Sequence, residues 1–233
     1  MSPRLVVEHV CKSFVLQGKP KPVLDHVSLQ IEAGEIVGLA GESGSGKSTL
    51  ARCIIGLLNR DSGTIHLNGR PLPDRYRARD FKAQANQVQM IFQDPLSSLN
   101  PRLTLEDSLT EPLSINSNLS ASAKRDQAAQ WLTRMGLRAS DLSRYPHSFS
   151  GGQLQRIGIA RALISQPQLL LCDEPVSALD VSVQAQIVNL LLDLRDEFGL
   201  SLLFIGHDLA MMRYLCDRIL VMDQGKIVNG YSC

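Results

Sequence analysis

Short apolar runs alternate along the chain with longer segments whose apolar residues are spaced for a helix. The apolar runs, typical of strands buried in a sheet, cover residues 36–40, 87–92, 168–172 and 200–205. The helical segments cover residues 50–58, 151–165, 182–197 and 208–215. Because strands that alternate with helices form parallel sheets, the pattern predicts an α/β fold with a mostly parallel sheet.

A second, smaller sheet is predicted from the first third of the chain. Residues 4–10, 23–31 and 64–67 have the pattern of strands, and turn residues flank them. We expect these strands to form an antiparallel sheet beside the parallel one, with residues 18–22 as a loop. Residues 70–86 are rich in charge and predict a solvated segment. At the other end of the chain, residues 218–222 and 226–228 predict a closing pair of strands.

The pattern changes over residues 95–165, where helical spacing dominates. A short helix is predicted to begin at Thr104 and a longer one to cover residues 121–135, with a flexible link at 114–123. Trp131 lies on the apolar side of the longer helix and is predicted to be buried. We therefore expect a single domain over residues 1–233. Its core is formed by residues 1–94 and 166–233, and residues 95–165 are an inserted helical subdomain.

Composition narrows the possible functions. The net charge of +1 and the absence of a basic cluster argue against nucleic acid as a partner. Five cysteines without a CxxC pair argue against a disulfide framework or a zinc site and for a reducing compartment. Residues 1–4 do not begin a secretory segment, and no run approaches about 18 apolar residues. We expect any role at a membrane to depend on partners.

A phosphate-binding loop follows the apolar run at residues 36–40. Residues 41–49 fit the pattern G-x-x-x-x-G-K-[ST] and stand between a predicted strand and a predicted helix, as this motif requires. Glycines let backbone N–H groups turn toward phosphate oxygens, and the helix N-terminus favours an anion. Lys47 is predicted to reach the β- and γ-phosphates, and the Ser48 hydroxyl to bind Mg²⁺. The predicted nucleotide-binding residues here are Gly41, Ser43, Gly44, Ser45, Gly46, Lys47, Ser48 and Thr49.

Two adjacent carboxylates end the apolar run at residues 168–172. A carboxylate at the end of a buried strand supplies the second contact to Mg²⁺ in enzymes with this loop, and Asp173 has that position. Glu174 is adjacent and is predicted to act on the attacking water as a general base. The loop and the carboxylates together predict nucleotide hydrolysis.

A third motif, Ser150-Gly151-Gly152-Gln153, stands before a predicted helix, about a hundred residues after the phosphate loop. With Asp173-Glu174 about twenty residues further on, it resembles the signature of ABC-type ATPases. The resemblance covers essentially the whole chain. It implies a P-loop NTPase core with the two added subdomains described above, and ATP and Mg²⁺ as ligands. It also implies a head-to-tail dimer, in which the residues that meet ATP held by the other subunit are Ser150, Gly151, Gly152, Gln153 and Asp180.

Three further positions match the family. Gln93 matches the glutamine that contacts Mg²⁺ and senses the membrane partner, and His207 matches the histidine that contacts the γ-phosphate. Phe14 matches the aromatic residue that stacks on adenine. By this resemblance the catalytic residues are Glu174, His207 and Gln93, and the Mg²⁺ ligands are Ser48, Gln93 and Asp173.

Longer stretches narrow the resemblance to the ATPase subunits of peptide and nickel importers. These are residues 92–102, residues 145–147 before the signature, and residues 173–186. The resemblance implies a second ATPase subunit, identical or paralogous, two membrane-spanning permease subunits and a substrate-binding protein as partners. It places the chain on the cytoplasmic face of the cell membrane. It does not name the cargo, because other subunits select it.

Two departures from this subfamily leave alternatives open. Gly206 stands where Thr or Ser usually precedes the histidine, and the chain ends at Cys233 without the tail containing His-Pro-Tyr-Thr that many members carry. A truncated chain or a short-tailed importer of metals or metallophores is compatible with that ending. An ATPase of the carbon–phosphorus lyase assembly, or an ABC ATPase without a role in transport, is the alternative function. ABC ATPases that act on DNA or ribosomes carry a long coiled-coil insertion or a second cassette. The sequence contains neither, which argues against an ABC ATPase without a role in transport.

Overall fold

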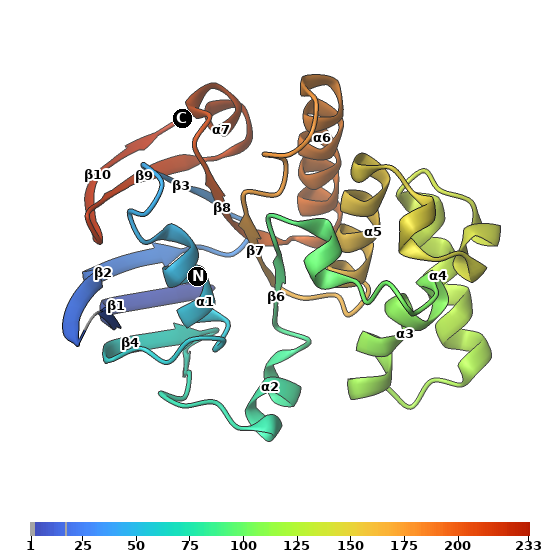
Figure 1. The fold of residues 1–233 in the computed structure, drawn as a ribbon, viewed down its shortest axis with the longest axis horizontal. Coiled ribbons are helices and arrows are strands. Elements are labelled where there is room, and N and C mark those ends of the chain that lie inside the picture. Colours follow the sequence, from blue (N-terminus) through green and yellow to red (C-terminus); the bar gives the residue numbers. More distant parts are fainter. Residues whose placement is uncertain (1–2, 17) are drawn as a thin grey trace.

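A six-stranded sheet forms the centre of the computed structural model, which describes residues 3–16 and 18–233 (Figure 1). The prediction that residues 1–4 do not begin a secretory segment therefore falls partly outside the described residues, at positions 1 and 2. In sheet order the strands are β10 (Lys226–Ser232), β9 (Arg218–Asp223), β3 (Ile36–Ala40), β8 (Ser201–Gly206), β7 (Leu169–Asp173) and β6 (Val88–Ile91). All neighbouring pairs are parallel except β10 with β9. The predicted α/β fold with a mostly parallel sheet is confirmed.

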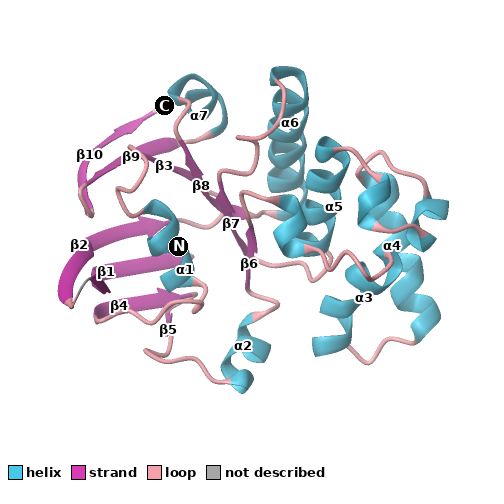
Figure 2. Ribbon diagram, in the orientation of Figure 1, coloured by secondary structure: helices cyan, strands magenta, loops and turns pink. Residues whose placement is uncertain are grey.

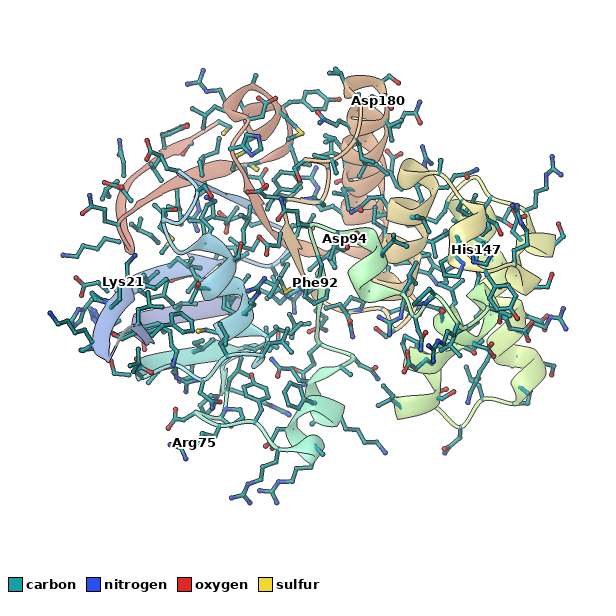
Figure 3. The ribbon with its side chains drawn as sticks, viewed as in Figure 1. Lys21, Arg75, Phe92, Asp94, His147 and Asp180 are labelled. Atoms are coloured by element: carbon teal, nitrogen blue, oxygen red, sulfur yellow. The ribbon has the colours of Figure 1, made fainter. Side chains whose placement is uncertain are left out.

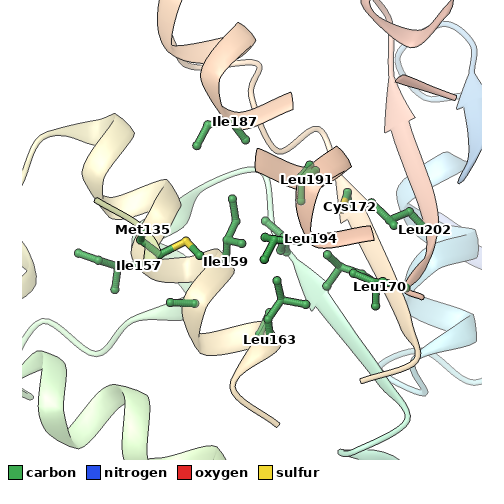
Figure 4. Packing of buried hydrophobic residues seen from close by; sticks show 14 of the residues in the cluster. Met135, Ile157, Ile159, Leu163, Leu170, Cys172, Ile187, Leu191, Leu194 and Leu202 are labelled. Atoms are coloured by element: carbon green, nitrogen blue, oxygen red, sulfur yellow. The ribbon is translucent and has the colours of Figure 1, made fainter. Parts of the chain in front are cut away.

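Successive side chains of these strands enter two different hydrophobic clusters. In β7, Leu169 and Leu171 belong to the cluster shared with the N-terminal sheet, whereas Leu170 and Cys172 belong to the cluster shared with the helices. This alternation follows from the two-residue period of a strand. Figure 4 shows the second cluster, in which Leu170 packs with Leu163 and Leu194. Both faces of the sheet are covered, which explains why its strands are apolar runs rather than alternating ones.

The second sheet is antiparallel, as predicted, in the order β2-β1-β4-β5. Its strands are β1 (Leu5–Leu16), β2 (Lys19–Ile31), β4 (Ser62–Leu67) and β5 (Arg70–Pro71). The prediction of a loop at residues 18–22 was wrong for residues 19–22, because Leu16 pairs with Lys19 and the hairpin continues to its end. The sequence there is Lys-Pro-Lys-Pro, and β2 is an edge strand, where proline is tolerated because no ladder hydrogen bond is lost.

Two helices near this sheet differ from the predictions. α1 (Lys47–Ile54) begins three residues earlier than predicted and ends earlier, since Gly56 has a φ of +83°. Residues 70–86 are mostly exposed, as predicted for a solvated segment, but α2 (Ala78–Gln84), which was not predicted, forms within them. Phe81 of α2 packs on Tyr76 with ring centroids 5.0 Å apart. This aromatic contact stabilises α2, a helix that the charge pattern of the segment does not predict.

Residues 95–165 are all described and contain helices and no strand. The helices are η1 (Pro95–Ser98), α3 (Leu105–Asn116), α4 (Ala121–Arg134), η2 (Ala139–Ser143), η3 (Pro146–Ser148) and α5 (Gly151–Leu163). Figure 2 shows them on the opposite side of the molecule from the antiparallel sheet. Trp131 is buried, as predicted, and stacks on Phe198 at 5.7 Å. The boundaries at 94/95 and 165/166 stay a prediction, because this segment shares one hydrophobic cluster with the sheet.

The last two helices, α6 (Val181–Phe198) and α7 (Leu209–Leu215), follow β7 and β8. α6 begins at an N-cap, Asp180, whose carboxylate accepts a hydrogen bond from the N–H of Val183. In the part of the chain that the structure describes, no helix is long and apolar enough to cross a membrane.

Candidate nucleotide-binding site

The loop between β3 and α1 depends on three glycines with positive φ. Gly41, Gly44 and Gly46 have φ values of +152°, +84° and +112°, which residues with a side chain rarely adopt. A Cβ atom on Gly41 would lie 2.1 Å from the carbonyl oxygen of Met222, and one on Gly46 would lie 2.7 Å from that of Val23. The loop therefore packs backbone to backbone against β9 and β2.

We expect Gly41→Ala to destabilise the protein by about 2 kcal/mol or more, because both backbone strain and a clash with β9 oppose it. Gly34 is the matched control: its φ is +77°, but nothing lies within 4 Å of a Cβ atom there. Gly34→Ala should cost about 1–2 kcal/mol from strain alone. Urea unfolding of both variants measures the difference, and equal losses would contradict the close packing of the loop.

Lys47, the first residue of α1, is almost fully buried. Its Nζ donates hydrogen bonds of 2.8 Å to the carbonyl oxygens of Gly41 and Glu42, so the ammonium is held by its own loop. Removal from water lowers the pKa of Lys47, whereas the carboxylates of Glu174 and Asp173 raise it and offset part of this effect. A buried ammonium bonded only to neutral carbonyls favours an anion beside it.

Ser48 and Asp173 form a direct contact although they are 125 residues apart in the chain. The Ser48 hydroxyl donates to Oδ1 of Asp173 at 2.7 Å, and Asp173 is buried at the end of β7. Burial raises the pKa of Asp173, and the hydrogen bond from Ser48 acts against this. The pair offers hard oxygen atoms side by side, the donor type that Mg²⁺ prefers.

Glu174 follows Asp173 and lies between two other predicted site residues. Its Oε2 accepts a hydrogen bond of 3.2 Å from Nε2 of Gln93 and lies 3.9 Å from Nδ1 of His207. Its backbone has a φ of +48°, which is uncommon for a residue with a side chain. The carboxylate of Glu174 contacts residues that follow β6 and β8, the strands on either side of β7. Three strands, β6, β7 and β8, thus end at one group of polar side chains.

A cleft of about 610 Å³ joins these groups. It is lined by Phe14, Val23, Gly41, Glu42, Ser43, Gly44, Gly46, Lys47, Ser48, Thr49, Gln93, Glu174 and His207. Two predicted residues, Ser45 and Asp173, are buried and do not line it; the Ser45 backbone bonds to Glu42 and Gly225, and Asp173 connects through Ser48. Phe14 lies at the cleft, with the ammonium of Lys12 5.6 Å from its ring centroid.

Val23 and Glu42 line the cleft but were missed in the sequence. Val23 sits in β2, opposite the end of β1 that carries Phe14, where Phe14 pairs with Lys21. Because residues 18–22 were expected to form a loop, no signal placed Val23 beside Phe14. Glu42 is a variable position of the phosphate-loop pattern, so only its neighbours could have indicated it.

The five residues predicted to act on the other subunit's nucleotide stand apart from this cleft. None of them is among the described residues that line it. Ser150 caps α5, where its hydroxyl accepts from the N–H of Gln153, and the Gln153 side chain accepts from the N–H of Ser150 at 3.0 Å. A Cβ atom on Gly152 would lie 2.7 Å from Val183, so glycine lets the first turns of α5 and α6 meet. Figure 3 labels Asp180 at the exposed start of α6.

A phosphate loop between a central strand and a helix, with carboxylates at the ends of neighbouring strands, defines a P-loop nucleotide-binding protein. Residues 24–177 match the ABC transporter family. The chain also shares 48% identity, over 97% of its length, with the oligopeptide transport ATP-binding protein OppF of Haemophilus influenzae. The chain belongs to the ABC transporter family.

Other relatives agree with this membership. OppF of Escherichia coli is 50% identical over 91% of this chain, and a putative peptide import ATP-binding protein of Brucella abortus is 44% identical over 98%. The chain spans 70%, 63% and 72% of the length of these three relatives.

Two solved structures share the fold. The cassette MJ0796, described as a dimer in a post-hydrolysis state with ADP and phosphate, matches with a TM-score of 0.89 at 29% identity, over 98% of both chains. CbiO1 of Clostridium perfringens, described as part of the ABC transporter complex cbiONQ, matches with a TM-score of 0.85 at 25% identity. That match covers 100% of this chain and 89% of the other.

Proposed function

We propose that the chain is the ATP-binding and ATP-hydrolysing subunit of a peptide importer. Its similarity to oligopeptide transport ATP-binding proteins over most of its length carries this proposal. The cleft supports the ATPase part, because it combines an anion-binding loop with a carboxylate poised beside it. Peptides are favoured over nickel, since the relatives described above are named for peptides. The same names do not favour a carbon–phosphorus lyase or a role outside transport.

The phosphates of ATP would lie on the backbone amides of residues 41–49, where the start of α1 adds partial positive charge. Lys47 would exchange its two carbonyl partners for the β- and γ-phosphates, which are stronger acceptors. Ser43 and Thr49 are at the cleft surface and can donate further hydrogen bonds. Phe14 would stack on the adenine ring, with Lys12 already beside it.

The donor set fits Mg²⁺. Ser48 and Asp173 supply a hydroxyl and a carboxylate already 2.7 Å apart, and Gln93 supplies an amide at the same end of the sheet. When bound with ATP, the ion would neutralise charge on the phosphates. Glu174 would then take a proton from the attacking water, while Gln93 and His207 orient the carboxylate and the γ-phosphate.

A head-to-tail dimer would complete the site. The capped starts of α5 and α6 lie side by side and are exposed, so they present backbone N–H groups to a neighbour (Figure 1). Ser150, Gly151, Gly152 and Gln153 would meet the γ-phosphate held by the other subunit, and Asp180 would lie across the interface. The dimer of MJ0796 supports this arrangement as a property of a related cassette.

Membrane-spanning permease subunits would supply the transport pathway, with a substrate-binding protein acting through them. The chain would then be a peripheral protein on the cytoplasmic face of the membrane. The segment after Gln93, residues 94–109, is one candidate for the docking surface, because the sequence there is more apolar than a free loop and includes Leu96, Leu99, Pro101 and Leu103. Leu99 of that segment is buried, with 3% of its surface exposed, so Leu99 belongs to the core, whereas Leu96 and Leu103 are exposed.

A better docking surface is an apolar groove of about 310 Å³ between α2, β6 and α3. Its lining includes Ile55, Ala85, Val88, Phe81 and Ile115, and the last two are 40% and 43% exposed. The groove is bordered by both the core and the helical segment. A helix of a permease subunit bound there would therefore be displaced when the helical segment moves relative to the core. Gln93 follows β6, which connects the groove to the carboxylates of the site.

We expect Phe81→Glu and Ile115→Glu to reduce assembly with the permease subunits and peptide uptake by about tenfold or more, as loss of a central interface anchor does. Basal ATP hydrolysis of the isolated chain should remain. Co-purification, uptake and phosphate release measure the three quantities. Val228→Glu is the matched control, since Val228 is 58% exposed on β10 and outside the groove. Full uptake in the groove variants would place the docking surface elsewhere.

A further inference from the structure

A bulge in the β1–β2 hairpin brings together three side chains that can bind a metal ion. Val10 pairs with Val27 and Lys12 with Leu24, so one residue of β1, Cys11, stands opposite two residues of β2, Asp25 and His26. The extra residue in β2 takes a left-handed conformation, with a φ of +53° at His26. A bulge re-aims side chains in this way because it interrupts the alternation of the strand.

The donor atoms of these residues are close to one another. The Cys11 sulfur, a carboxylate oxygen of Asp25 and a ring nitrogen of His26 all lie within 4.8 Å of one another. Tetrahedral zinc, with Zn–S of about 2.3 Å and Zn–N or Zn–O of about 2.0–2.2 Å, needs donors about 3.3–3.8 Å apart. The His26 side chain is 71% exposed and can turn by the remaining distance.

Neighbouring groups prepare this cluster for a cation. Nδ1 of His26 lies 2.7 Å from Oδ1 of Asp25 in a hydrogen-bonded pair, so the exposed imidazole has to turn away from the carboxylate to reach the donor spacing of about 3.3–3.8 Å. Lys226 bonds to Oδ2, the other oxygen of the carboxylate, and thereby fixes its orientation as an outer partner of a ligand does.

We propose that Cys11, Asp25 and His26 form a binding site for a divalent transition metal ion of the Zn²⁺ type. The thiolate and imidazole favour such an ion over Mg²⁺, which prefers oxygen donors only. Three protein ligands leave a fourth position for water. The sequence argued against a zinc site because it contains no CxxC pair. The bulge instead brings one cysteine beside an aspartate and a histidine of the neighbouring strand, which sequence spacing does not reveal.

The site adjoins the nucleotide cleft without being part of it. Cys11 precedes Phe14 by three residues on β1, and the N–H of Asp25 donates to the carbonyl oxygen of Gly225 at 2.9 Å. Gly225 in turn donates to the carbonyl oxygen of Ser45 in the phosphate loop, also at 2.9 Å. A metal ion bound at the hairpin is therefore two backbone contacts away from that loop.

The test is a titration of the nucleotide-free full chain with Co²⁺, followed by displacement with Zn²⁺. A thiolate ligand gives cobalt a strong charge-transfer absorption in the near ultraviolet, and we expect one equivalent to produce it. Cys11→Ser should abolish this absorption, and Cys233→Ser, which removes an exposed cysteine elsewhere, should leave it unchanged. Cys53, Cys172 and Cys216 are buried and do not compete.

His26→Gln provides a second, independent variant, because an exposed side chain can be replaced without unfolding the hairpin. We expect it to weaken Zn²⁺ binding, measured against a chelating dye, by more than the about 10–100-fold that loss of an outer partner of a ligand costs. Thermal melting should show both variants folded. Absence of the absorption, its loss in Cys233→Ser instead of Cys11→Ser, or unchanged Zn²⁺ affinity in His26→Gln would each overturn the proposal.

Discussion

Replacing Glu174 by Gln is expected to reduce ATP hydrolysis by about 10²–10⁴-fold while ATP still binds. The amide keeps the shape of the side chain, but it cannot accept a proton from water. Steady-state phosphate release measures the first effect, and equilibrium binding of a fluorescent nucleotide measures the second. Because binding survives and turnover does not, the variant should also accumulate as an ATP-bound dimer in size-exclusion chromatography.

A matched control for this experiment is Glu197→Gln. Glu197 is a half-exposed carboxylate on α6 that bonds to Arg134, far along the helix from the cleft. This substitution should leave turnover unchanged. Near-normal hydrolysis by Glu174→Gln would refute the role proposed for Glu174 and would direct attention to His207, 3.9 Å from it.

The second large effect is expected when two inactive variants are mixed. Lys47→Ala should weaken nucleotide binding by about tenfold or more, because a charge-assisted hydrogen bond to phosphate is lost. Ser150→Arg should place a bulky cation at the exposed start of α5 and block its contact with the other subunit's nucleotide. Each variant alone should be almost inactive.

A mixed dimer keeps one complete site, formed by the phosphate loop of the Ser150→Arg subunit and the α5 start of the Lys47→Ala subunit. We expect an equal mixture to recover up to about a quarter of wild-type hydrolysis, since random pairing makes half of the dimers mixed. The phosphate-release assay of the mixture and of each variant provides the comparison. A mixture no more active than its components would mean either that two complete sites are obligatory or that α5 acts within its own subunit. Crosslinking of a photoactivatable ATP analogue to both variants would separate these two cases.

The sequence predicted the parallel sheet well because each of its strands is an apolar run, which burial on both faces requires. It was wrong at residues 19–22 and did not predict α2 within the solvated segment, for a common reason: local composition there does not indicate the structure that forms. Lys-Pro-Lys-Pro favours an exposed loop, yet the pairing of Leu16 with Lys19 extends the hairpin. The charged segment around Phe81 is fixed by packing on Tyr76, a contact that no periodicity reveals.

For the site, motif residues were predictable wherever backbone geometry demands a particular residue, as at Gly41 and Gly46. The contact of Ser48 with Asp173 was predictable as chemistry, through a shared Mg²⁺ ion, but not as a direct hydrogen bond. For Leu99, in contrast, residue type alone did not determine the role. Its apolar character was compatible with docking or with the core, and only its burial decides for the core.

The order of strands in the central sheet has a consequence for how the protein is made. β3, which leads into the phosphate loop, pairs with β8 and β9, so that Ile36 lies beside Leu202 and Val37 beside Arg218. During synthesis the antiparallel strands β1, β2 and β4 can pair early, since they are close in sequence. β3 has no sheet partner until most of the chain has left the ribosome. The capacity to hold nucleotide therefore arises late, and a chain interrupted before β8 would expose an apolar strand to aggregation rather than retain a partial activity.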